Sequence, residues 1–234
     1  MRIVSIVGLK DSGKTSLSVK IIKELKKRGY SVATIKDSHH QMEMDKENTD
    51  TWKHKEAGSS TIVGLGATSF FNIREKLPLE RLLFLIKVIN EPDFVVIEGF
   101  KTYNYPKIAT SKEIVDDYTL ELVDSFNITD DEISILTDKI EKKTYDIVNT
   151  LFTNNCGFNN GDEIAKGIIN NEINIDDLDK IDVNLSIDGK VVGLNHFVND
   201  FIKESILGML KTLKTEEYSV ESQNKIEIII NNNK

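Results

Sequence analysis

The residues that could do chemistry start at Gly8, in a run with the spacing Gly-x-x-x-x-Gly-Lys-Thr that ends at Thr15. A glycine-rich turn between a buried strand and a helix aims backbone N–H groups at phosphate oxygens, and the helix dipole adds its positive end. We expect Lys14 to neutralise the β- and γ-phosphates and the Thr15 hydroxyl to bind Mg²⁺. The residues expected to hold a purine nucleoside triphosphate are Gly8, Lys10, Asp11, Ser12, Gly13, Lys14, Thr15 and Ser16.

A carboxylate from the end of a neighbouring strand should complete this site. The apolar run over 93–97 predicts a buried strand, and Glu98 follows it directly. Open α/β sheets place their sites at the carboxyl ends of parallel strands. We therefore expect Glu98 to act on Mg²⁺, directly or through water, and to share any catalytic role with Lys14. The alternative is a strand that is followed by an acidic residue without a function.

The elements that must position these residues alternate between strand and helix. Apolar β-branched residues predict a strand over 3–7, a helix that Arg28 and Gly29 close comes next, and a second strand follows over 32–35. That order predicts a parallel sheet, so the fold class is α/β, a P-loop NTPase three-layer sandwich with a mainly parallel sheet. The other elements expected are a hairpin of strands at 61–65 and 68–73, a helix from Pro78, a strand at 120–128 and a helix at 139–152.

Composition divides the rest of the chain. We expect a nucleotide-binding domain over 1–153, followed by a linker or small subdomain over 154–180 that is rich in Asn, Asp and Gly. Residues 181–234 predict a small α+β module of ββαβ order, with an amphipathic helix over 197–213 and a final strand over 225–230. The module is small for independent stability, so its helix is either its own core or a surface for a partner or a second copy.

Charge and composition exclude several classes of protein. The chain has 234 residues and a net charge of −8, which gives no support to nucleic-acid binding. No run approaches the roughly 20 apolar residues of a membrane span, and the start reads into a strand rather than a signal peptide. The lone cysteine, Cys156, allows no disulfide within the chain and cannot hold an iron–sulfur cluster. We therefore expect a cytoplasmic protein that binds neither nucleic acid nor membrane.

Two common classes of P-loop protein lack their signatures here. A Ras-like GTPase would show Asp-x-x-Gly, which is absent, and Asn-Lys-x-Asp, whose nearest match at 224–227 ends in Glu. A nucleoside monophosphate kinase would need an arginine-rich lid, and the four arginines are scattered. The run Thr129-Asp130-Asp131 lies about where P-loop proteins read the base, although such acids are more often helix caps. The sequence leaves the choice between GTP and ATP open.

Further blocks, in order, resemble those of the molybdopterin-guanine dinucleotide biosynthesis adapter family, often called MobB. The blocks are Lys36-x-x-His39-His40, Asp50-Thr-x-Lys53 with a following Ala-Gly, Glu98-Gly-Phe-Lys101, and Pro106-Lys107-Ile108. The resemblance covers about residues 1–150. The chain departs from the family pattern at Gln41, Asn48 and Lys53, where the family has an acid, a glycine and an arginine.

The resemblance implies GTP binding with Mg²⁺ and at most a slow GTPase activity. It implies an adapter that helps a partner molybdenum cofactor guanylyltransferase join guanylate to molybdopterin, and we expect a homodimer. Carried over, Lys36, His39, His40 and Asp50 would line the space beyond the γ-phosphate or contact the partner or the pterin. Lys101 and Lys107 are either solvated or receive a pterin phosphate. The alternatives are a P-loop small-molecule kinase and a non-enzymatic nucleotide-binding scaffold.

Overall fold

A parallel sheet carries the glycine-rich loop at its centre. The computed structural model describes residues 1–38, 45–154, 157–158, 160–213 and 225–230, and within them the sheet has five strands in the order β2-β5-β1-β6-β7. All of its neighbouring strands run parallel. The strands are β1 (Arg2–Val7), β2 (Val32–Lys36), β5 (Phe94–Glu98), β6 (Lys107–Ala109) and β7 (Thr119–Leu122).

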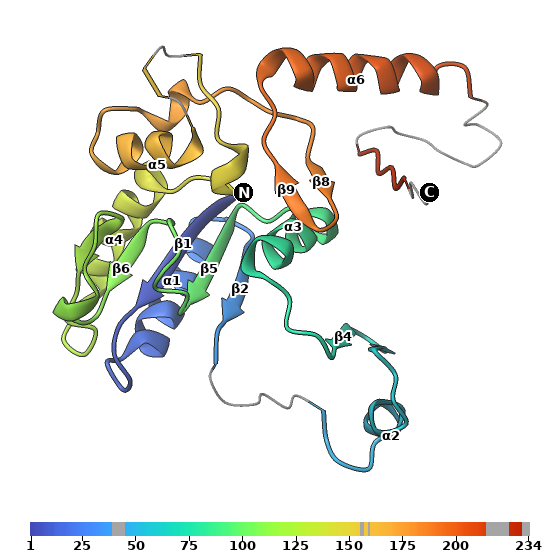
Figure 1. Cartoon of the computed structure of the whole chain (residues 1–234). Helices are drawn as coiled ribbons and strands as arrows, with labels where there is room; N and C mark the ends of the chain where they lie inside the picture. The colour runs from blue at the N-terminus through green and yellow to red at the C-terminus, as the bar shows by residue number, and fades with distance from the viewer. Residues whose placement is uncertain (39–44, 155–156, 159, 214–224, 231–234) are drawn as a thin grey trace.

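Helices cover both faces of this sheet, because successive residues of β1 point to opposite sides. Ile3 belongs to a buried cluster with residues of α3 (Leu79–Ile89) and α5 (Gly161–Ile169). Val4 packs instead with α1 (Lys14–Lys27) and α4 (Asp130–Lys143). Figure 1 shows the strands between these helices. The predicted three-layer α/β fold is therefore confirmed.

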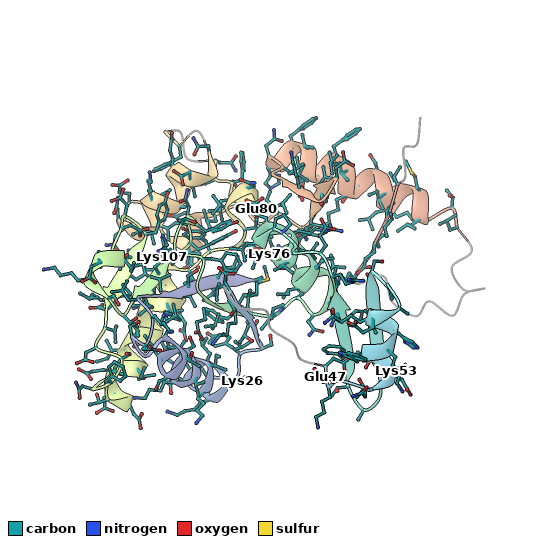
Figure 2. All side chains as sticks on the ribbon, turned by 60° about the horizontal axis from the view of Figure 1, so that its bottom comes forward. Lys26, Glu47, Lys53, Lys76, Glu80 and Lys107 are labelled. Carbon is teal, nitrogen blue, oxygen red and sulfur yellow. The ribbon has the colours of Figure 1, made fainter. Side chains whose placement is uncertain are left out.

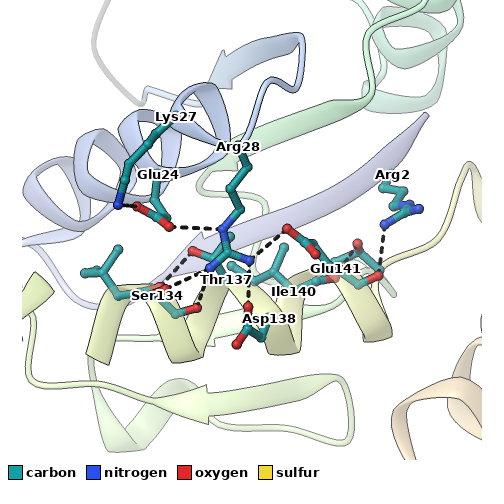
Figure 3. Close-up of polar contacts among 11 residues, drawn as sticks. Arg2, Glu24, Lys27, Arg28, Ser134, Thr137, Asp138, Ile140 and Glu141 are labelled. Atoms are coloured by element: carbon teal, nitrogen blue, oxygen red, sulfur yellow. Dashed lines mark hydrogen bonds and ion pairs between the residues drawn. The ribbon is translucent and has the colours of Figure 1, made fainter. Parts of the chain in front are cut away.

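Arg28 fastens α1 to α4, as Figure 3 shows. Its guanidinium donates to Glu24 on its own helix, at 3.0 Å, and to Asp138 and Glu141 on α4, at 2.6 and 2.9 Å. A further bond runs to the Ser134 carbonyl at 2.8 Å. Since α1 begins at the end of the glycine-rich loop, this anchor fixes the helix on which the loop rests.

An arm is inserted between β2 and α3. It contains α2 (Asp50–Glu56) and a hairpin of β3 (Thr61–Leu65) with β4 (Ser69–Ile73), and it stands apart from the parallel sheet (Figure 1). The predicted hairpin is confirmed, and its two strands pair with each other rather than with the main sheet. α2 covers one side of the hairpin, where Thr51 approaches Gly64.

The predicted bounds of two elements, β7 (Thr119–Leu122) and α4, were wrong. The strand expected at 120–128 ends at Leu122, and the helix expected at 139–152 is α4, which starts nine residues earlier at Asp130. Thr129 caps this helix in a capping box with Glu132, and Asp130 and Asp131 lie in its first turn. The chain leaves the helix at Thr144, and Tyr145 forms a bridge with Ile3 of β1.

The C-terminal part holds β8 (Leu185–Ile187), β9 (Lys190–Val192) and α6 (His196–Leu210). In the described part of the chain residues 225–230 form no strand, so that prediction was wrong. α6 buries only Asn199 among its described residues, and Phe197 and Met209 are exposed, so its apolar stripe is not the core of a module. α5, from the region expected as linker or subdomain, shares the buried cluster of Ile3. None of the helices in the described ranges is long and apolar enough to cross a membrane.

Candidate nucleotide-binding site

The glycine-rich loop leaves the carboxyl end of β1 and leads into α1. Gly13 is the N-cap of α1 and adopts the left-handed conformation, with a φ of 74°. A Cβ atom there would lie 2.1 Å from Ser125 Oγ, and one at Gly8 would lie 2.0 Å from Thr110 Oγ1. Both positions therefore require glycine, and the loop keeps the close wrap that a phosphate cradle needs. The first turn of α1, which is described in full, holds no acidic residue to offset its dipole.

Three of the predicted site residues meet at the mouth of this loop. The Thr15 hydroxyl donates to the Glu98 carboxylate, with both carboxylate oxygens at 2.9 Å, and Lys36 Nζ lies 3.2 Å from Glu98 Oε1. Parallel pairing places Glu98 beside Lys36 because β5 lies next to both β1 and β2. A hydroxyl and a carboxylate in contact are the protein ligands that Mg²⁺ takes beside a triphosphate. These residues fit a magnesium nucleotide.

The lysine of the motif lies across the loop. Lys14 Nζ donates to the Leu9 carbonyl at 2.5 Å, so its ammonium is held over the turn where phosphate oxygens would lie. Lys10 and Asp11 are exposed at the tip of the loop, and Asp11 has a φ of 57°. Ser16 is exposed in the first turn of α1. These residues surround the space in which the sequence predicts the triphosphate.

Hydroxyl groups that the sequence analysis missed brace the loop from β6 and β7. The Ser111 hydroxyl accepts from Leu9 N at 3.0 Å, and Thr110 Oγ1 lies 2.6 Å from Ser12 Oγ. Ser125, beyond β7, donates to the Ser12 carbonyl at 2.7 Å. Single serines and threonines carry no periodic signal, and β6 is too short to be recognised. Only the strand order reveals that these residues lie beside the loop.

Other predicted residues are not brought to this mouth. Asp50 lies on α2 in the arm, exposed, and pairs with Lys53 at 3.4 Å. Figure 2 shows Lys53 far from Lys107, which belongs to the sheet. Lys101 is exposed in the turn after β5. His39 and His40 lie outside the described residues.

Lys107 corrects the expectation of a solvated or phosphate-binding lysine. Its side chain is 1% exposed, it forms an ion pair with Asp116, and its ammonium lies 5.5 Å from the centre of the Tyr118 ring. It starts β6 and pairs with Ser5, two residues before the end of β1 that leads into the glycine-rich loop. The expectation failed because Asp116, whose carboxylate allows the Lys107 ammonium to be buried, comes from a separate turn nine residues later.

A metal site made of protein side chains alone is not found in the described part of the chain. No group of three or more His, Cys, Asp or Glu residues gathers there. Thr15 and Glu98 supply one hydroxyl and one carboxylate, which leaves the other positions of Mg²⁺ to phosphates and water. The site therefore fits a cation that arrives with a nucleotide.

Comparisons with known proteins identify the family of this chain. A family model described as MobB, molybdopterin guanine dinucleotide synthesis protein B, matches residues 3–130. A putative molybdopterin-guanine dinucleotide biosynthesis adapter protein of Methanocaldococcus jannaschii is 31% identical over 227 residues, which cover 92% of each chain. The adapter protein of Haemophilus influenzae is 34% identical over 133 residues, covering 53% of this chain and 75% of its own.

Among solved structures, Bacillus subtilis MobB matches with a TM-score of 0.42 and 29% identity, covering 47% of this chain and 67% of that one. A MobB homologue from Bacillus stearothermophilus matches with a TM-score of 0.43 and 21% identity, covering 59% of this chain and 97% of that one. The family model spans more than half of the sequence, and the M. jannaschii relative aligns along nearly all of it. The chain belongs to the MobB family, the molybdopterin-guanine dinucleotide biosynthesis adapter proteins.

Proposed function

We propose that this protein is a GTP-binding adapter that assists a molybdenum cofactor guanylyltransferase in converting molybdopterin to molybdopterin guanine dinucleotide. The observation that carries the proposal is the contact of Thr15, Glu98 and Lys36 at the mouth of the glycine-rich loop, in a chain that belongs to this family. Magnesium is its second cofactor, and the cytoplasm is its place of action.

Each loop residue has a role in holding the nucleotide. Backbone N–H groups between Gly8 and Thr15 receive the phosphate oxygens, and Lys14 leaves the Leu9 carbonyl to neutralise the β- and γ-phosphates. Mg²⁺ is held by the Thr15 hydroxyl, with Glu98 as the carboxylate that binds it directly or orients its water. Lys36 balances the charge of Glu98 and faces the phosphate end.

Hydrolysis is slow in this proposal, because fast GTP hydrolysis in P-loop proteins uses an arginine at the transferred phosphate in addition to the lysine of the loop. In the described part of the chain each arginine is engaged elsewhere. Arg2 and Arg28 bond to α4, Arg74 lies near the Lys55 carbonyl in the arm, and Arg81 lies over Phe84. The bound GTP therefore supports the partner enzyme and is not turned over in a rapid cycle of hydrolysis.

The partner and the pterin meet the exposed residues around this mouth. Lys101 follows the strand that carries Glu98, and Asp50 lies on the arm. On the family pattern we propose the same role, contact with the partner or the pterin, for His39 and His40. Lys101 is the cation proposed for a pterin phosphate, since Lys107 is buried.

A guanylylation assay tests the proposal. Molybdopterin, GTP, Mg²⁺ and the transferase are incubated with and without this protein, and the yield of the dinucleotide is measured. The wild type should raise the yield, Lys14→Ala should not, and Lys26→Ala, an exposed lysine later on the same helix, should match the wild type. Equal yields with and without the wild-type protein would overturn the adapter role.

We also propose that two copies associate through the hairpin of the arm. The side away from α2 carries Val63 and Leu65 of β3 and Phe71 and Ile73 of β4, all between 42% and 85% exposed. Charged residues are absent from both strands, so the surface can pair with its own copy about a two-fold axis.

Mass measurement by light scattering tests the dimer. The wild type should have twice the mass of one 26.5 kDa chain, and Phe71→Glu should have the mass of a single chain. Ile89→Glu, at a residue that is 65% exposed on α3, should remain dimeric. A wild-type protein with the mass of one chain would refute the dimer.

A further inference from the structure

The loop that follows β7 lies directly beside the phosphate loop. Ser125 is 3% exposed and donates to the Ser12 carbonyl at 2.7 Å. A Cβ atom at Gly13 would lie 3.4 Å from Cε1 of Phe126. The side chains of this loop are therefore held next to the residues that begin α1. A nucleotide bound by its phosphates at Gly13 and Thr15 has to place its sugar and base against a neighbouring surface.

Phe126 gives this surface an exposed aromatic ring. Its side chain is 71% exposed, although the ring edge approaches the backbone of the phosphate loop. Aromatic rings accept bases by stacking, and one that stands in water beside a phosphate cradle has an apolar surface to cover. Neither core cluster contains Phe126 among the described residues. The Phe126 ring is therefore available to stack on a purine base.

Asp124 places a carboxylate in the same loop. Its Oδ1 accepts from Phe126 N at 3.1 Å and its Oδ2 accepts from the Asn127 side chain at 2.7 Å. These bonds, the one from Asn127 above all, lower the pKa of Asp124, so the group is ionised at neutral pH. A carboxylate has about four acceptor positions, so acceptor capacity is left over.

The carboxylate also faces open space rather than packed side chains. Asp124 and Asn127 line a cavity of about 430 Å³ that Leu136 of α4 bounds from the other side. That volume is in the range of small-molecule sites. Two other carboxylates line this cavity: Glu121, which pairs with Lys139, and Glu132, which bonds to Thr129 at the start of α4. The Asp124 carboxylate differs from these two in that its bonds run to Phe126 and Asn127 of its own loop.

We propose that the loop over 124–127 selects the base of the nucleotide, with Phe126 stacked on the purine ring and the Asp124 carboxylate bound to guanine. Guanine offers two adjacent donors, N1–H and the 2-amino group, which a carboxylate accepts together. Adenine presents an unprotonated N1 at that edge, which a carboxylate repels. Asp124 is thus the residue that distinguishes GTP from ATP. This inference rests on the proposed nucleotide binding and adds its specificity.

Replacement of the carboxylate by an amide gives the decisive test. Xanthine has a carbonyl where guanine has its 2-amino group, so an amide that donates a hydrogen bond fits xanthine and no longer fits guanine. In calorimetric titrations with GTP, ATP and XTP, Asp124→Asn should lose about 10- to 150-fold in GTP affinity. It should also gain affinity for XTP. Asp131→Asn, in the first turn of α4, should keep the wild-type order of affinities.

Phe126→Ala gives a second, independent readout. Loss of stacking should weaken GTP and ATP alike, by about 5- to 150-fold, while Phe126→Tyr keeps the affinity. If Asp124 only shapes the loop, Asp124→Asn will lower GTP and XTP affinity together, and the inference is wrong. Unchanged GTP affinity in both variants would also overturn it. A wild type that binds no nucleotide would instead refute the proposed function.

Discussion

The Thr15 hydroxyl and the Glu98 carboxylate are in contact at 2.9 Å although 83 residues separate them in the sequence. The contact follows from the parallel pairing of β1 with β5, which brings the start of α1 beside the end of β5. Lys36 reaches the same carboxylate from β2, on the other side of β5. Three strand ends thus converge on the place where a magnesium triphosphate would be bound.

Removing either member of this pair should remove the magnesium dependence of nucleotide binding. In Thr15→Ala and in Glu98→Gln, the ratio of GTP affinities with and without Mg²⁺ should fall on the order of 10- to 100-fold, since each variant loses a metal contact. Thr15→Ser keeps a hydroxyl at this position and should keep the ratio. If Thr15→Ala kept the wild-type ratio of GTP affinities with and without Mg²⁺, the Thr15 hydroxyl would not be a ligand of the metal.

Gly13→Ala should destabilise the loop and impair nucleotide binding. The φ of 74° costs an L-residue about 1–2 kcal/mol, and the new methyl group would collide with Ser125 Oγ. Urea unfolding measures the loss, and titration with GTP measures the change in affinity. Gly66→Ala is the matched control, because the nearest atom to its Cβ is 4.0 Å away, and it should change stability by less than about 0.5 kcal/mol.

The anchor between α1 and α4 should make stability depend on pH. The hydrogen bond from Arg28 holds the pKa of Glu24 below its ordinary value of 4.5. The unfolded chain therefore takes up this proton first as the pH falls. The contribution of ionised Glu24 to the free energy of unfolding is complete above about pH 4.5. It disappears as the pH falls through the pKa that Glu24 has in the folded protein.

The matching experiment compares urea midpoints of the wild type and Arg28→Ala as a function of pH. The variant should be less stable at neutral pH, and the difference should shrink in acid. Lys27→Ala is the control, because Lys27 is 78% exposed and its pair with Glu24 contributes little. A gap between wild type and Arg28→Ala that stays constant into acid would contradict the ionic anchor.

Lys107→Ala should lower the free energy of unfolding by about 2 kcal/mol, because it empties a buried position and leaves Asp116 without its cation. The figure is below that of a fully buried pair, since Asp116 is 39% exposed. Lys107→Met restores the apolar volume and should lose less. GTP affinity should be unchanged in both variants. Weaker binding with unchanged stability would return Lys107 to the list of phosphate-binding candidates.

Much of the site was predictable because its signals are local. Three signals can be read within short windows of sequence: the spacing from Gly8 to Thr15, the apolar strand before Glu98, and the run that starts at Lys36, the last residue of β2. The two strands of the arm's hairpin were predicted from the runs on either side of Gly66. The sequence could therefore predict that Thr15 and Glu98 meet, once a parallel sheet was inferred.

The remainder depends on contacts that no local pattern records. β6 has three residues, and its first, Lys107, is tolerated inside only because Asp116 reaches it. The start of α4 was missed because its first turn is acidic and its apolar residues begin at Ile133. The alternating isoleucines near the C-terminus have strand character, but a strand also needs a neighbouring edge, which 225–230 does not have within the described residues.

The most direct test of the account is calorimetric titration of the wild-type protein with GTP and with ATP, each with and without Mg²⁺. The account predicts that GTP binds more tightly than ATP, that Mg²⁺ strengthens the binding, and that Lys14→Ala abolishes it. Equal affinity for ATP and GTP, or GTP binding that survives Lys14→Ala without change, would contradict it.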